Sequence, residues 1–174
     1  MNGQKMTTKA SSSPFSIAVS KNVERFTFNK GWDHRKHYNS LFNAQNHIIS
    51  QHFSQHPSWA MMADWRDWLV NVPESERLCI RTLDRFVNIG LTHYAVVANQ
   101  HPIAKWQAEK VKAANPSLCI QIFEEFESGE KWLQERGFDT NFTSIPFEIK
   151  WLSPSKTFIE IIDSLQLERE YFST

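Results

Sequence analysis

Histidines four residues apart are the first feature of this chain that suggests metal chemistry. His52 and His56 would lie on one face of a helix, and His34 and His37 precede them by a few turns. A zinc site needs three or four ligands with supporting hydrogen bonds, and neither aspartate nor glutamate stands next to the pair. His34 and His52 also fall on the apolar side of the expected helix. We therefore expect histidines of the core or of helix ends, and no metal site.

Nucleophilic and nucleotide chemistry have little support in the sequence. It contains neither a Gly-x-Ser-x-Gly elbow nor a glycine-rich phosphate loop nor a His-Glu-x-x-His motif. Only five glycines are present, which makes a backbone cradle for a nucleotide hard to build. Cys79 and Cys119 each stand between apolar residues, so we expect two buried thiols in a reducing compartment. The expected protein is not an enzyme, and it has no catalytic residue and no cofactor.

The segment 64–68 has the strongest binding character. Its sequence alternates charged residues with tryptophan, and tryptophan and arginine are enriched in binding hot spots. Ligands of open α/β sheets collect at the carboxyl ends of strands, where this segment and 99–101 should converge. The alternative is that both tryptophans cover the core while the charged residues form local ion pairs and caps. The candidate binding residues are Asp64, Trp65, Arg66, Asp67, Trp68, Asn99 and His101.

Hydrophobic periodicity indicates the strands that must position these residues. Apolar residues alternate with other types over 15–19 and again over 26–28, which predicts an N-terminal hairpin with one face against the core. Continuous apolar runs at 58–63 and 94–98 suit interior strands covered on both faces, and 118–123 also reads as a buried strand. Trp59, Trp106 and Trp132 are expected in the core.

Helix signals separate these strands. Asp33 can cap a helix over about 34–55, and proline opens further helices at Pro73 and Pro102. A last amphipathic helix ends at Gly137. The order is β-β-α-β-α-β-α-β-α. It predicts an α/β fold with a mixed, mostly parallel sheet, an N-terminal hairpin and flanking helices.

The amino-acid composition limits the classes of partner that the protein is expected to bind. Lys+Arg and Asp+Glu both number 19, so the formal net charge is zero, and non-specific nucleic-acid binding is disfavoured. No apolar run reaches the roughly 18 residues of a membrane span. Residues 1–14 lack the apolar stretch of a signal peptide, so we expect a disordered leader and a cytoplasmic protein.

Three motifs follow one another over residues 15–138. The first is segment 64–68, which leads to residues 72–74. The second is the end of a helix at Gly90 followed directly by a strand that reaches Val97. The third is segment 123–127, followed by the helix that contains Trp132. Their order and spacing resemble the STAS-like fold of the anti-sigma-factor antagonists, particularly the compact SpoIIAA-like branch of bacteria. The resemblance implies a regulatory domain that binds proteins. That family carries an Asp-x-Ser-type phosphorylation loop, whereas 64–68 contains no hydroxyl residue, so phospho-switching is not carried over.

Residues 139–174 form a C-terminal extension beyond the family's compact domain. Apolar residues at helical spacing predict an amphipathic helix over 157–167. This helix would cover its own domain, dock across a homodimer interface or lie on a membrane, and its acidic residues disfavour the membrane. The candidate interface residues are Phe158, Ile161, Ile162 and Leu165.

Two functions are expected. The first is a non-enzymatic, cytoplasmic STAS-like domain that acts by binding an unknown protein partner or by self-association, for instance as a homodimer. The alternative is a carrier or sensor of a small hydrophobic ligand, held between the first helix and the sheet. A pocket lined by Phe42, His52 and Phe53 would favour the carrier, whereas a solid core with exposed Trp65 or Trp68 would favour the protein-binding domain.

Overall fold

A six-stranded sheet forms the centre of the protein. The computed structural model describes residues 13–53, 55–68, 73–98 and 102–145 of the 174-residue chain. The strand order is β5-β4-β3-β2-β1-β6; β2 to β5 are parallel, and β1 is antiparallel to both of its neighbours. The predicted mixed, mostly parallel sheet of an α/β fold is therefore confirmed. The strands are β1 (Phe15–Val19), β2 (Val23–Phe28), β3 (Trp59–Asp64), β4 (Leu91–Val97), β5 (Cys119–Phe123) and β6 (Thr143–Ser144).

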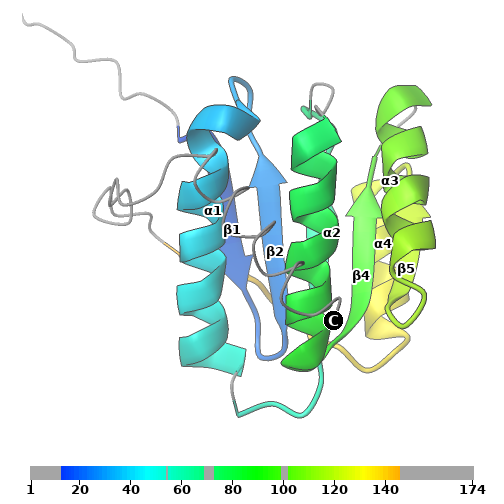
Figure 1. Ribbon diagram of the computed structural model, residues 1–174. Coiled ribbons are helices and arrows are strands. Elements are labelled where there is room, and N and C mark those ends of the chain that lie inside the picture. Colours follow the sequence, from blue (N-terminus) through cyan, green and yellow to red (C-terminus); the bar gives the residue numbers. More distant parts are fainter. Residues whose placement is uncertain (1–12, 54, 69–72, 99–101, 146–174) are drawn as a thin grey trace, which may run out of the picture.

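Four α-helices cover the two faces of this sheet unequally. The helices α1 (His34–Ile48), α2 (Pro73–Asn88) and α3 (Pro102–Ala114) each join one parallel strand to the next. Because every connection moves one strand in the same direction with the same preferred hand, the three helices lie on one face. Figure 1 shows them in front of the sheet, with α4 (Phe126–Gln134) behind it.

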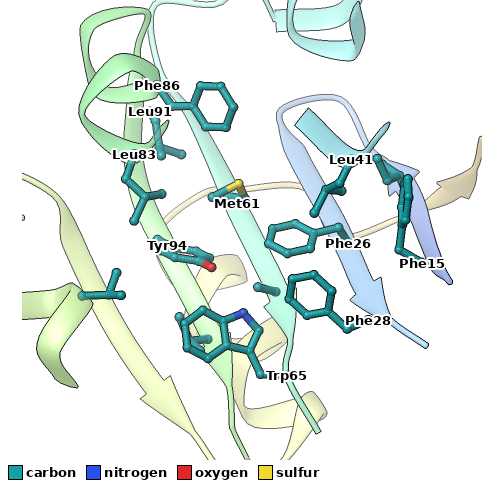
Figure 2. Close-up of a cluster of buried hydrophobic side chains, with 14 of the residues drawn as sticks. Phe15, Phe26, Phe28, Leu41, Met61, Trp65, Leu83, Phe86, Leu91 and Tyr94 are labelled. Atoms are coloured by element: carbon teal, nitrogen blue, oxygen red, sulfur yellow. The ribbon is translucent and has the colours of Figure 1, made fainter. Parts of the chain in front are cut away.

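The larger core fills the space between the sheet and the first three helices. All six residues of β3 are buried, and four consecutive residues of β4 are too, because strands on both sides and helices on both faces cover them. The predicted interior strands at 60–63 and 94–98 are confirmed. Figure 2 shows how aromatic this core is; its labelled members are Phe15, Phe26, Phe28, Leu41, Met61, Trp65, Leu83, Phe86, Leu91 and Tyr94.

A smaller core lies beneath α4. Small strand residues such as Ala60 and Ala95 let this helix approach the sheet, where it buries Leu133. Gly129 is part of the same fit, because a Cβ atom at that position would lie 3.0 Å from the terminal methyl group of Met62. The sheet is therefore buried on both faces at its centre.

The end of the first helix differs from the prediction of one helix over 34–55. α1 ends at Ile48, and a π-helical turn follows at Ile49–Phe53. A π turn holds more residues than an α turn and therefore changes which later side chains face the core. Phe53 is fully buried, whereas His52 is exposed. The expectation that His52 continues the apolar side of the helix is wrong.

Two further predictions differ from the structure. Among the described residues, β5 has a neighbouring strand on one side only, and Cys119 is exposed, while Cys79 is partly buried. The predicted burial of the Cys119 thiol is therefore wrong. Trp59 is fully buried and Trp132 half-buried, but Trp106 is 59% exposed on α3, so its assignment to the core is wrong as well.

The segment that follows the predicted domain boundary at 138 joins the opposite edge. β6 pairs with β1 through Ser144 and Thr143, and the Ser20 hydroxyl group donates a hydrogen bond to the Asp139 carbonyl oxygen. The first seven residues of the predicted extension thus belong to the folded unit. The predicted leader, apart from residues 13 and 14, and the candidate interface residues of the tail lie outside the described residues. The tail residues concerned are Phe158, Ile161, Ile162 and Leu165.

Candidate ligand-binding site

The loop that follows β3 turns its two tryptophans inward. Asp64 accepts hydrogen bonds from the backbone N–H of Arg66 at 3.1 Å and from its guanidinium group at 2.9 and 2.7 Å. The Trp65 backbone N–H donates to the Val97 carbonyl oxygen, and the Trp68 backbone N–H donates to the Trp65 carbonyl oxygen. These bonds close a tight turn at the carboxyl end of the sheet. Charged groups hold the outer side of the turn, and both indole rings face the core.

The structure separates the candidate binding residues into two groups. Trp65 and Trp68 are buried against each other with ring centroids 4.1 Å apart, and Asp64 is buried as well. Arg66 and Asp67 are exposed. This arrangement matches the alternative of covering tryptophans with a local ion pair, and a part for these residues in binding stays a prediction. Asn99 and His101 lie outside the described residues.

A cavity lies directly behind the two tryptophans, between α1, α2 and the sheet. The space open to the centre of a water-sized sphere is about 40 Å³, and all the empty space between the atoms, open solvent included, is about 410 Å³. Half-buried Cys79 and Thr82 of α2 stand at the less covered side. Neither Phe42, His52 nor Phe53, the residues expected around a pocket, lines this one. The lining residues are Phe26, Phe28, His34, Tyr38, Leu41, Gln45, Met61, Trp65, Trp68, Cys79, Thr82, Leu83, Phe86 and Tyr94.

Several nitrogen atoms in this region lack hydrogen-bond partners. Among the described residues, no partner is found for the Nε1 atoms of Trp65 and Trp68 or for either ring nitrogen of His34. His34 begins α1, and its ring centroid lies 4.7 Å from that of Trp68. Burial lowers the pKa of His34 to about 4, opposed by the charge of Asp33, so the imidazole is neutral at pH 7. A neutral imidazole offers one donor and one acceptor.

Tyrosines form the remaining polar part of the cavity. Tyr38 shares a hydrogen bond of 2.5 Å with the hydroxyl group of Thr82, and burial raises the pKa of Tyr38. Burial also raises the pKa of Tyr94 far above its usual value, although the nearby Trp65 indole opposes this effect, so both phenols stay protonated. Figure 2 shows the Tyr94 hydroxyl group and the Trp65 indole nitrogen on the sides of their rings nearest Phe26 and Phe28.

Cys79 has the character of an inert thiol. Burial, reinforced by the nearby charge of Glu76, raises the pKa of Cys79 to about 12. A thiol with that pKa is almost wholly protonated at pH 7, and nucleophilic attack requires the thiolate. The described lining therefore holds no charged side chain, and Cys79 is not a nucleophile at pH 7.

A buried carboxyl group lies beside the cavity. Glu24 in β2 is fully buried and accepts a hydrogen bond of 2.9 Å from Gln45, which itself lines the cavity. Burial raises the pKa of Glu24 to about 7, although the Gln45 hydrogen bond opposes this effect. The other carboxyl oxygen has no hydrogen-bond partner within the described part of the chain.

Sequence reasoning missed the importance of Glu24 and Tyr94. The signal for Glu24 was present, because it occupies the same face of β2 as Phe26 and Phe28 in a strand with period two. His34 was placed on the buried side of α1, as the structure shows, but nothing in the sequence indicated that its nitrogens would lack partners. The described residues contain no group of three histidine, cysteine, aspartate or glutamate side chains arranged for a metal ion.

Within the described ranges, no helix is long and apolar enough to cross a membrane. Comparison with models of protein families, with curated proteins and with solved structures finds no match to this chain.

Proposed function

We propose that this protein binds a small, largely apolar molecule in the cavity between α1, α2 and the sheet, as a carrier or sensor. The observation that supports this proposal is the combination of an aromatic cavity with buried N–H groups that lack partners, namely those of Trp65 and Trp68. A buried donor without a partner costs about 1–3 kcal/mol, and a structural core normally avoids this cost. A bound molecule would recover it.

The test is a thermal-shift screen of small aromatic compounds on the full-length protein. A compound that binds only the folded state raises the melting temperature, because at 100 times its dissociation constant it adds about 2.7 kcal/mol of stability. Cys79→Leu, which places a larger side chain at the opening, should abolish the shift. Cys119→Leu makes the same chemical change on exposed β5 and should preserve it. Equal shifts in both variants would place binding outside the cavity.

A STAS-like, non-enzymatic regulatory domain that binds another protein in the cytoplasm is the second candidate. Two hairpin strands are followed by α1 and then by three strand–helix units, and the helix of the last unit, α4, lies on the other face of the sheet. This order supports the STAS-like assignment. An apolar surface on α3 supports protein binding, since Trp106 is 59% and Ile103 is 43% exposed. Trp106→Ser should weaken capture of a partner and leave the thermal shift by cavity ligands unchanged.

Self-association through the C-terminal extension belongs to this second candidate. We propose that the stripe containing Phe158 and Ile161 docks across a homodimer. Truncation after Leu152 should then convert a dimer to a monomer, which light scattering measures directly. A truncated chain with unchanged mass in solution would exclude the tail from the interface.

A further inference from the structure

The wall of the cavity offers hydrogen-bond donors without formal charge. An indole nitrogen donates and cannot accept. The Nε1–H group of Trp68 has no acceptor among the residues that the structure describes, and that of Trp65 makes no well-formed hydrogen bond, although it lies close enough to the Tyr94 hydroxyl group to lower its pKa as a donor does. The amide nitrogen of Gln45 already donates to Glu24, and the described lining includes neither lysine, arginine, aspartate nor glutamate. The neutral imidazole of His34 adds one further donor and one acceptor without partners, so donors outnumber acceptors among the unpaired polar atoms of this wall, and none of these atoms is charged.

We propose, resting on the ligand-binding function above, that the cavity selects an uncharged aromatic molecule that carries a hydrogen-bond acceptor such as a carbonyl oxygen. The 40 Å³ open to the centre of a water-sized sphere leaves room for a small molecule, since one water needs about 10–15 Å³ on such a measure. In this proposal the acceptor group lies near Trp65 and Trp68. The ring lies beside Tyr38 and half-buried Cys79.

Both charged classes of ligand meet a specific obstacle. The nearest buried carboxyl group is that of Glu24, one hydrogen bond away through Gln45, so an anion would face an acid and would find no cation in the described lining. A cation could lie over the aromatic rings, but it has no lone pair to accept from the indole N–H groups of Trp65 and Trp68. An uncharged acceptor avoids both costs.

The test compares four probes of similar size on the full-length, ¹⁵N-labelled protein: acetophenone, isopropylbenzene, benzoate and phenyltrimethylammonium. The seven tryptophans give separate indole N–H signals in a two-dimensional NMR spectrum. Acetophenone should bind about tenfold more tightly than isopropylbenzene, which corresponds to about 1.4 kcal/mol for one recovered hydrogen bond. It should also move the signals of Trp65 and Trp68 downfield and leave the signal of exposed Trp106 in place.

Each outcome separates this inference from the proposed function. Equal binding of isopropylbenzene, or tighter binding of either ion, would overturn the selectivity while retaining the cavity as a ligand site. If none of the four probes moves the Trp65 or Trp68 signals, the inference and the proposed binding function both fail. Trp65→Phe and Trp68→Phe assign the two signals. If one variant does not fold, the order of the four affinities on the natural protein still decides.

Discussion

Replacing Glu24 by glutamine should stabilise the protein at pH 8 and leave its stability unchanged at pH 4. Burial raises the pKa of this carboxyl group from 4.5 to about 7, so the folded protein holds the acidic proton more tightly than the unfolded chain does. Its favourable contribution is fully present below pH 4.5 and is lost as the pH rises through 7. Since a pKa difference of one between the two states corresponds to about 1.36 kcal/mol, the loss is about 3 kcal/mol. Glutamine keeps the shape and the Gln45 hydrogen bond without ionising.

The pKa of His34 predicts the opposite slope in the same protein. Burial lowers that pKa from 6.5 to about 4, so the unfolded chain binds a proton at His34 more readily than the folded protein does. The contribution of His34 to stability is therefore fully present above pH 6.5 and is lost as the pH falls through 4. The two groups therefore nearly offset each other in the natural protein between pH 4 and 8. Glu24→Gln removes one of the two slopes, and its stability should rise with pH from 4 to 6.5.

Urea unfolding followed by circular dichroism, repeated at half-unit steps from pH 4 to 8.5, measures these slopes. The difference between Glu24→Gln and the natural protein should grow from near zero to about 3 kcal/mol, which corresponds to about 10 °C in melting temperature for a chain of this size. Glu109→Gln, at an exposed position on α3, is the matched control and should show no such growth. A difference that is constant with pH, or a less stable Glu24→Gln at pH 8, would refute the reasoning.

Three further predictions concern other parts of the fold. Gly90→Ala should destabilise the protein by about 1–2 kcal/mol in urea unfolding. Gly90 has a φ angle of +102°, and an added Cβ atom would lie 3.4 Å from a backbone carbonyl oxygen. Unchanged stability would contradict this reasoning. Tyr38→Phe should cost about 1 kcal/mol by removing the hydrogen bond to Thr82, whereas a gain in stability would mean that this bond is not formed. A thiol reagent at pH 7.5 should modify exposed Cys119 within minutes and partly buried Cys79, whose pKa is raised, only after denaturation. Rapid reaction of both thiols in the folded protein would contradict the covered position and the raised pKa of Cys79.

The sequence was sufficient to predict the strands in the interior of the sheet but not to predict which strands lie at its edges. Uninterrupted apolar runs identified β3 and β4 because a strand covered on both faces must be apolar at every position. At β5 the prediction of burial holds for Leu118 and Ile120 but is wrong for Cys119, which is exposed on a strand at the sheet edge. The order of the strands decides whether a given strand lies at the edge or in the centre of the sheet, and a local sequence pattern does not specify that order.

The candidate site shows the same division. The sequence correctly put segment 64–68 after a strand, at the carboxyl edge where ligands of such sheets collect. It left open which way Trp65 and Trp68 would face, because that depends on the bonds from Asp64 to Arg66 and on the space between α1 and α2. The cavity itself arises from how side chains of five helices and strands and of the loop after β3 fit together, and the spacing of residues along the sequence does not specify such a fit.

A crystal structure of the protein with acetophenone would test the central claim most directly. Ligand density should lie between Tyr38 of α1, Cys79 of α2 and the Trp65–Trp68 pair, with the carbonyl oxygen within about 3 Å of an indole nitrogen. Density at the exposed Trp106 surface alone, or a cavity that holds only ordered water at saturating acetophenone, would contradict the account.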